Sequence, residues 1–333
     1  MHDAPQANDR IDLAGTDVSV PPLGVGTWAW GDKGTWGMGG YDASYSEATI
    51  LDAWQACIEA GVVLFDTAEV YGGGESERII GRLLAHDPSV RQQVVIATKF
   101  MPSPWKLAVT SSLVSAAKAS VERMGIACID LYQIHGPISL RSHEALAEAL
   151  ATAHADGLVK AVGVSNYSAK ETRSIVTALR KRDLQLATNQ IEFSLLRTMP
   201  EKVGLLEACR ELGVVPLAYS PIGQGRLTGK YTAAHPPPKQ RTFSSHPMET
   251  VEKIVGVLKG IGTAHGGRTP SQVALAWIIA KGVIPIPGAK NRAQAEDNAG
   301  ALGWQMTDEE VAELDAVALY GQRKISQRIW QHG

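Results

Sequence analysis

This sequence of 333 residues contains few cysteines and few phenylalanines, and its positive and negative charges nearly balance. Its three cysteines, Cys57, Cys128 and Cys209, lie far apart, with no C-x-x-C motif and no metal-ligand spacing. We expect small core residues in a reducing compartment and no metal site. The net charge of −2 provides no basic surface for nucleic acid or for a membrane, which leaves small molecules as partners.

Signals for export or membrane insertion are also missing. The longest clean apolar run, residues 273–280, is much shorter than the roughly 20 residues that span a bilayer. Residues 1–10 carry Asp3 and Asp9 and lack the apolar segment of a signal peptide. The sequence therefore predicts a cytoplasmic protein.

The chain instead contains a regular alternation of β-rich runs and helical patterns. We expect eight strands, at residues 23–27, 62–67, 94–99, 129–135, 161–166, 187–192, 214–220 and 283–287. The helical patterns lie at residues 46–60, 75–84, 110–124, 142–155, 168–182, 200–212 and 249–280. Strands that are apolar on both faces and alternate with helices predict a parallel sheet, and eight such units favour an α/β fold of the (β/α)8 TIM-barrel type.

Two further segments complete this expected single domain of residues 1–333. Residues 11–13 and 18–20, on either side of a turn at 15–17, predict a β-hairpin at the bottom of the barrel. Residues 231–245, which contain three consecutive prolines, predict a long irregular βα loop on the opposite, C-terminal face.

Titratable side chains follow three consecutive predicted strands. Asp66, Lys99 and His135 each stand at a strand end, and Tyr71 follows Asp66 within a glycine-rich turn. A carboxylate and a tyrosine five residues apart can meet only if the turn folds the tyrosine back. Parallel neighbouring strands lie roughly 4.8 Å apart, so all four groups can converge at the face where barrel enzymes place their active sites.

The four side chains suit proton transfer to an oxygen. An ammonium near a phenol lowers the pKa of the phenol, which gives Lys99 a role beside Tyr71. Asp66 would keep Lys99 charged and oriented, and His135 would help to position a carbonyl oxygen. From mechanism alone, Lys99 could instead form a Schiff base, as in a barrel aldolase.

Eight motifs, in order along the chain, resemble those of the aldo-keto reductase superfamily. They are GVGTW (24–28), FDTAEVYGGGESE (65–77), IATKF (96–100), DLYQIH (130–135), GVSNY (163–167), NQIEFSLL (189–196), AYSPIGQGRLTGKY (218–231) and IPIPGAKNRAQAEDN (284–298). The resemblance implies a catalytic tetrad of Tyr71, Lys99, Asp66 and His135. It also implies an NADPH-dependent enzyme that reduces an aldehyde or ketone, with Tyr71 as the general acid. A regulatory subunit that binds the cofactor as a redox sensor is the alternative on the same fold.

The resemblance further implies where NADPH or NADP⁺ would lie. Ser165, Asn166 and Gln190 would bind the nicotinamide carboxamide, Tyr219 would stack on the ring, and the loop at residues 220–227 would pass over the pyrophosphate. The expected cofactor residues are Gly26, Thr27, Trp28, Asp66, Ser165, Asn166, Gln190, Tyr219, Ser220, Pro221, Gly223, Gly225, Leu227, Gly288, Lys290, Gln294 and Asn298. Lys290 would meet the 2′-phosphate, because a cation near a helix N-terminus needs an anion to compensate it.

The substrate pocket departs from the common family pattern. Gly136 and Pro137 follow His135 where many relatives carry an aromatic residue, which predicts a more open pocket. The expected substrate residues are Trp28, Tyr71, Met101 and His135, and Trp30 and Trp105 are further candidates for an apolar wall.

Overall fold

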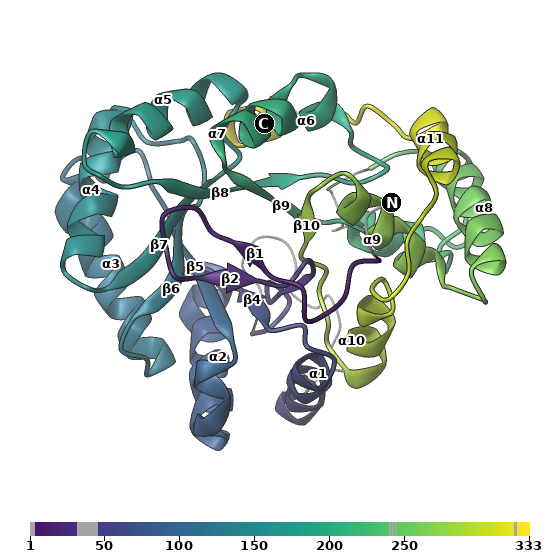
Figure 1. The fold of residues 1–333 in the computed structure, drawn as a ribbon, viewed down its shortest axis with the longest axis horizontal. Coiled ribbons are helices and arrows are strands. Elements are labelled where there is room, and N and C mark those ends of the chain that lie inside the picture. Colours follow the sequence, from purple (N-terminus) through teal and green to yellow (C-terminus); the bar gives the residue numbers. More distant parts are fainter. Residues whose placement is uncertain (1–3, 32–45, 240, 242, 244, 323–324) are drawn as a thin grey trace.

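The predicted eight strands form one parallel sheet that curves into a barrel (Figure 1). The computed structural model describes residues 4–31, 46–239, 241, 243, 245–322 and 325–333. In the sheet the order is β10-β9-β8-β7-β6-β5-β4-β3. The strands are β3 (Gly24–Gly26), β4 (Leu64–Asp66), β5 (Val95–Phe100), β6 (Ile129–Ile134), β7 (Val159–Ser165), β8 (Leu186–Glu192), β9 (Val215–Tyr219) and β10 (Ile284–Pro285).

The two ends of this strand order meet. Gly26 pairs with Gly288 in a parallel bridge, and the Gly26 N–H donates to the Pro287 carbonyl at 3.0 Å. These contacts join the edge beside β3 to the edge beside β10, which confirms the expected barrel.

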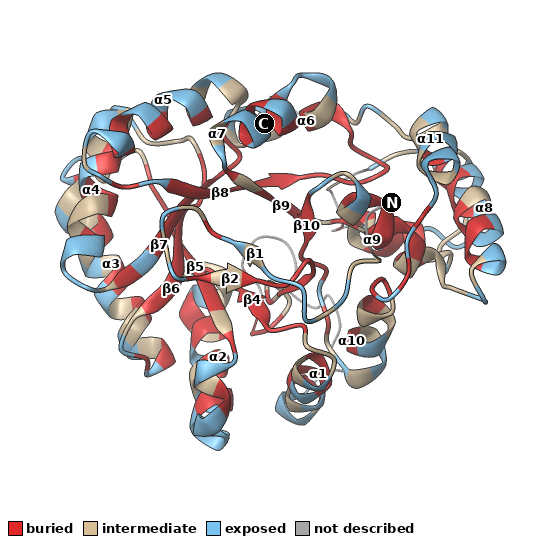
Figure 2. Ribbon diagram, in the orientation of Figure 1, coloured by how far each residue is buried: buried red, intermediate tan, exposed pale blue. Residues whose placement is uncertain are grey.

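Helices surround the barrel and turn their buried faces toward the strands (Figure 2). The helices are α1 (Glu47–Glu59), α2 (Glu75–His86), α3 (Val109–Met124), α4 (His143–Ala155), α5 (Ala169–Arg180), α6 (Met199–Lys202), α7 (Leu205–Leu212), α8 (Met248–Ala264), α9 (Pro270–Ala280), α10 (Arg292–Ala299), α11 (Asp308–Val317) and α12 (Ile325–Trp330). Short 3-10 segments lie at Tyr71–Gly74 (η1), Pro88–Gln92 (η2) and Gly223–Thr228 (η3). Capping boxes at Ser46, Ser168, Thr269 and Thr307 fix four helix starts, because side chain and backbone satisfy each other there.

The predicted hairpin is present and closes the bottom of the barrel. β1 (Ile11–Asp12) pairs antiparallel with β2 (Ser19–Val20). Leu13, Val18 and Val20 pack against inward-facing strand residues such as Leu64 and Leu131 in a separate apolar cluster. In Figure 1 the hairpin crosses the barrel opening that faces the viewer. The other opening is therefore the face on which polar side chains can meet a ligand.

Several predicted boundaries change in the folded chain. The helical block 249–280 is two helices, because the chain turns at Gly266 and Gly267 with φ of 73° and 87°. The block 200–212 divides at Gly204, whose φ is 77°. The described part of the 231–245 loop has no helix or strand, as expected, while residues 240, 242 and 244 lie outside the described residues. In the described part of the chain, no helix combines the length and the hydropathy needed to cross a bilayer.

Candidate active site

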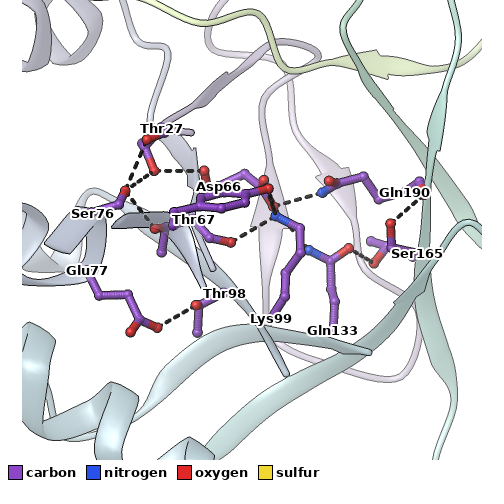
Figure 3. A network of polar contacts seen from close by, with 12 residues as sticks. Thr27, Asp66, Thr67, Ser76, Glu77, Thr98, Lys99, Gln133, Ser165 and Gln190 are labelled. Atoms are coloured by element: carbon purple, nitrogen blue, oxygen red, sulfur yellow. Dashed lines mark hydrogen bonds and ion pairs between the residues drawn. The ribbon is translucent and has the colours of Figure 1, made fainter. Parts of the chain in front are cut away.

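The four predicted titratable residues converge at the ends of β4, β5 and β6. Figure 3 shows two of them, Asp66 and Lys99, pointing toward each other. The Lys99 ammonium forms an ion pair with the Asp66 carboxylate, and its Nζ lies 3.3 Å from the Tyr71 hydroxyl. The Tyr71 and His135 rings meet edge to face with centroids 5.6 Å apart. The barrel thus brings together side chains that are up to 69 positions apart in sequence, from Asp66 to His135.

A glycine turn brings Tyr71 back toward the strand it has left. The Tyr71 N–H donates to the Ala68 carbonyl at 3.0 Å, and Gly72 follows with φ of 60°. A Cβ at Gly72 would lie 2.4 Å from the Gly31 carbonyl oxygen, so only glycine fits here. The sequence motif therefore encodes the geometry that the offset of five residues requires.

Lys99 is completely buried beneath the tyrosine. Its ammonium donates to Asp66, to the Thr67 carbonyl at 2.8 Å and to the Tyr71 hydroxyl. Burial lowers the pKa of Lys99, and the charges of Asp66 and Glu77 oppose this effect. A Schiff-base lysine needs a neutral amine that is accessible to substrate, so this environment disfavours the aldolase alternative.

Asp66 is held by donors from three strands. Its Oδ2 faces Lys99, while Oδ1 accepts from the Gln133 amide at 3.1 Å and from the Gln190 amide at 2.8 Å. Three N–H donors around one buried carboxylate fix its direction.

The role of Gln133 follows from strand register. Lys99, Gln133, Gly163 and Thr188 are paired in one row across β5, β6, β7 and β8. The Thr188 hydroxyl lies 3.3 Å from the Gln133 amide oxygen, which leaves the amide nitrogen facing Asp66. Sequence reasoning missed Gln133, although it lies two residues before His135 and period-two alternation places both on one strand face.

Tyr71 has a pKa well above its ordinary value, because burial disfavours the phenolate and the Asp66 charge adds to this effect. This direction is opposite to the one expected from Lys99. The reason is that burial outweighs the nearby ammonium, and the charge of Asp66, which is paired with Lys99, adds to the effect of burial on the pKa of Tyr71. Tyr71 is therefore a protonated hydroxyl at neutral pH, as a proton donor must be.

His135 is a neutral imidazole. Burial, with a smaller contribution from the Lys99 charge, holds the pKa of His135 well below 6.5. Its Nδ1 is buried and has no hydrogen-bond partner among the described residues. The predicted open space beside Gly136 is filled by the Trp330 indole. The ring centroids of Trp330 and His135 lie 5.3 Å apart, and a Cβ on Gly136 would lie 3.1 Å from the Trp330 side chain.

These groups lie at one end of a cavity of about 530 Å³. Of the predicted cofactor and substrate residues, those that line it are Gly26, Trp28, Asp66, Tyr71, Met101, His135, Ser165, Asn166, Gln190, Tyr219, Ser220, Pro221, Gly225, Gly288, Lys290, Gln294 and Asn298. Thr27, Gly223 and Leu227 are absent from the lining. Thr27 is buried behind the cavity, where its hydroxyl donates to the Asp66 carbonyl at 3.0 Å.

The tryptophans expected in the apolar wall separate into three environments. Trp28 lines the cavity with Met101, and its ring meets that of Phe243 at 5.7 Å. Trp30 is a core residue whose indole N–H donates to the Ala289 carbonyl at 2.8 Å. Trp105 is 79% exposed and does not line the cavity. Only Trp28 therefore fits the expected role.

A second polar cluster lies beyond Asp66, at the ends of β7, β8 and β9. The Ser165 hydroxyl donates to the Gln190 carbonyl at 2.9 Å, and the Asn166 amide donates to the Ser165 hydroxyl at 3.1 Å. The Tyr219 hydroxyl donates to Asn166 Oδ1 at 2.9 Å. Asn166 has a left-handed φ of 64°, which asparagine tolerates better than most residues.

Residues 22–319 match the sequence profile of the Aldo/keto reductase family. This chain belongs to that family. The chain is 36% identical over 327 residues to the chloroplastic pyridoxal reductase of Arabidopsis thaliana, covering 94% of this chain and 87% of that protein. Two solved structures are also similar to it. The glycerol dehydrogenase AKR11B4 of Gluconobacter oxydans has a TM-score of 0.79 at 28% identity, covering 95% of this chain and 98% of that one. An aldo/keto reductase of Klebsiella pneumoniae in complex with NADP and acetate has a TM-score of 0.70 at 26% identity, covering 92% and 94% of the two chains.

The loop that the aldo-keto reductase resemblance assigned to the pyrophosphate uses its amides internally. The N–H groups of Gly223, Gly225 and Leu227 donate to the carbonyls of Ser220 and Ile222 at 2.9–3.2 Å. Two cations, Lys230 and Arg241, also line the cavity. A Cβ on Gly225 would lie 3.1 Å from the Arg241 guanidinium and 3.4 Å from Lys230 Cε, so glycine leaves room for both.

The far end of the cavity carries the residues expected around an adenosine. Lys290 lines it, while the Gln294 amide oxygen accepts from the Lys290 N–H at 3.0 Å and the Asn298 amide donates to the Gly288 carbonyl at 3.2 Å. The described lining of the cavity therefore includes three cations, Lys230, Arg241 and Lys290, in addition to the groups around Tyr71. Such a donor set fits a dinucleotide with several phosphates.

Proposed function

We propose that this aldo-keto reductase reduces an aldehyde or ketone to the alcohol with NADPH, using Tyr71 as the general acid. The observation that carries the proposal is the contact chain from Asp66 through Lys99 to the protonated Tyr71 hydroxyl, next to a neutral His135. Family membership and the NADP complex of the Klebsiella relative support the choice of cofactor.

NADPH would be held along the whole cavity and, when bound, supplies the hydride for the carbonyl carbon. Ser165, Asn166 and Gln190 offer amide and hydroxyl groups to the nicotinamide carboxamide, and Tyr219 offers its ring face. Lys230 and Arg241 would meet the pyrophosphate. The adenosine end would lie against Gly288, Lys290, Gln294 and Asn298, with Lys290 as the cation for the 2′-phosphate.

The protein's part in the chemistry is to deliver a proton to the carbonyl oxygen. Tyr71 donates its hydroxyl proton to that oxygen as negative charge develops on it, and His135 helps to hold the oxygen in place. The tyrosinate left behind is stabilised by the Lys99 ammonium at 3.3 Å. Asp66 keeps Lys99 oriented, and water then returns a proton to Tyr71. The product is the alcohol.

A substrate screen that follows NADPH absorbance tests this proposal directly. We expect steady turnover with a panel of small and aromatic aldehydes, pyridoxal among them. Tyr71→Phe should lower kcat by about 10²-fold or more, the scale of a lost general acid, and leave NADPH affinity nearly unchanged. Wild-type turnover by Tyr71→Phe would remove the general acid from the proposal.

The absorbance screen and a separate trapping experiment distinguish the alternatives. A redox-sensing subunit would bind NADPH without steady turnover of any aldehyde. A Schiff-base enzyme would be trapped by borohydride as a covalent adduct on Lys99. The location in the cell stays a prediction, and the pyridoxal reductase named above is a chloroplast protein.

A further inference from the structure

Residues 330–333, here called the strap, lie against the polar cluster at the ends of β7, β8 and β9. In Figure 1 the C label marks this end of the chain, next to α6 and α7. Trp330 lines the cavity beside His135, while Gln331 and Gly333 are buried. No local sequence signal predicted that these residues would reach the site.

Gln331 links the strap to the Tyr219 hydroxyl. Its side chain is completely buried, and its amide nitrogen donates to Tyr219 Oη at 2.7 Å and to Glu192 Oε2 at 2.6 Å. Because a carboxylate only accepts, Glu192 fixes which way the Gln331 amide faces. The Tyr219 hydroxyl is then free to donate to Asn166 Oδ1, so the orientation of Asn166 depends on Gln331.

The strap backbone holds Asn166 from the other side. The N–H groups of His332 and Gly333 both donate to the Asn166 carbonyl, at 3.0 and 3.1 Å. These bonds secure a residue whose φ lies in the left-handed region, where most side chains are disfavoured. Asn166 is therefore held through its backbone by residues more than 160 positions away in sequence, and through its side chain by Tyr219, which Gln331 contacts.

The strap is anchored in a slot that fits its residues closely. Arg197 Nη2 donates to the main-chain oxygen of Gly333 at 2.7 Å, and His332 Nδ1 lies 2.8 Å from Glu171 Oε1. A Cβ at position 333 would lie 2.6 Å from the Tyr167 carbonyl oxygen and 2.7 Å from Leu205 Cδ2. Any larger residue at position 333 would push the strap out of this slot.

We propose that the strap is a positioning element for the nicotinamide half of the cofactor site, acting through Asn166 and Tyr219. This inference rests on the proposed function, which assigns those two residues to the nicotinamide. A site whose contact residues are fixed before binding loses less conformational freedom when the ligand arrives, which increases affinity. The hydrogen bonds from the strap reach Asn166 and Tyr219, so we expect its effect to fall on the nicotinamide half of the cofactor.

Two variants disturb the strap by different routes. Gln331→Leu removes the amide that orients Tyr219, and Gly333→Val displaces the backbone that holds Asn166. Gln322→Leu is the matched control, since it makes the same chemical change at an exposed position in the same part of the chain. The measurement is a fluorescence titration with NADPH and, in parallel, with 2′,5′-ADP, which carries only the adenosine half.

We expect both strap variants to bind NADPH about tenfold more weakly or worse, a change of roughly 1.4 kcal/mol, and to bind 2′,5′-ADP within about twofold of wild type. Gln322→Leu should match wild type with both ligands. Unchanged NADPH affinity in both strap variants overturns the proposal. Equal losses for NADPH and 2′,5′-ADP also overturn it, because they would show a general effect on the fold.

Different results would contradict the proposed cofactor site and the proposed role of the strap. If the wild type binds NADPH no more tightly than 2′,5′-ADP, the nicotinamide half adds nothing to the affinity. The assignment of the cofactor site is then wrong, and the strap has no role in it. If the wild type binds NADPH much more tightly than 2′,5′-ADP, and the strap variants show the same difference in affinity, only the strap proposal is wrong. Should Gly333→Val fail to fold, Gln331→Leu still decides between these outcomes, with 2′,5′-ADP binding as the measure of folded protein.

Discussion

Replacing Gln133 tests whether Asp66 must be held in one orientation for Tyr71 to act. Gln133→Met keeps the length and approximate volume of the side chain and removes the N–H that lies 3.1 Å from Asp66 Oδ1. The Gln190 amide and the Lys99 ammonium remain in place. The substitution thus removes one of three donors to a carboxylate that is only 3% exposed in its side chain.

The expected size of the effect follows from this environment. A hydrogen bond to a charged group contributes about 1.5–3 kcal/mol, and the two remaining donors place the loss at the lower end of that range. If the loss falls on the transition state, kcat decreases by about tenfold. Gln133 does not line the cavity, so the KM values for NADPH and for the aldehyde should stay within about twofold of wild type.

Steady-state kinetics with NADPH and one aldehyde measures this split between kcat and KM. Thr98→Val is the matched control, because it also removes a hydrogen bond to a buried carboxylate, the 2.6 Å bond from Thr98 to Glu77. Thr98 is the neighbour of Lys99 in β5, but its hydroxyl does not contact Asp66 or Tyr71. Wild-type kcat in Gln133→Met, or an equal decrease in Thr98→Val, would refute the reasoning.

Three further predictions follow from the charges in the site. Lys99→Met should lower kcat by about 10²-fold or more. It should also lower the free energy of unfolding by about 3–5 kcal/mol, because Asp66 stays buried without its cation. Adding Asp66→Asn to this variant should recover the stability measured by denaturant unfolding but not the activity measured by kinetics. Lys290→Ala should weaken the binding of NADPH by roughly 1.5–3 kcal/mol and have little effect on the binding of NADH. If a fluorescence titration shows that the wild type binds both cofactors with equal affinity, the assignment of Lys290 to the 2′-phosphate is contradicted. Burial holds the pKa of His135 well below 6.5, so below that pH the unfolded chain binds a proton that the folded chain does not, and the free energy of unfolding should decrease as pH falls. Melting temperatures between pH 7 and pH 5 should decline less steeply in His135→Gln, and identical slopes would argue against this contribution of His135.

The sequence alone determined the barrel and the position of the tetrad. Apolar runs that end in Asp66, Lys99 and His135 mark both the strands and the face where they end, since the period of a strand and the ends of parallel strands are local properties. The glycines after Tyr71 encode the turn in the same way. All eight predicted strands overlap the observed ones, with boundaries that differ by up to two residues.

Tertiary structure decided what surrounds the tetrad. The row from Lys99 through Gln133 to Thr188 depends on the register between strands, which no single segment specifies. The raised pKa of Tyr71 depends on burial and on the distance to Asp66, so the presence of a lysine in the sequence could not give its direction. Trp330 meets His135 because the last residue of α12 lies at the barrel mouth, nearly 200 positions later in the sequence. Local patterns reveal periodicity and turns, whereas contacts between distant segments depend on how the whole chain packs.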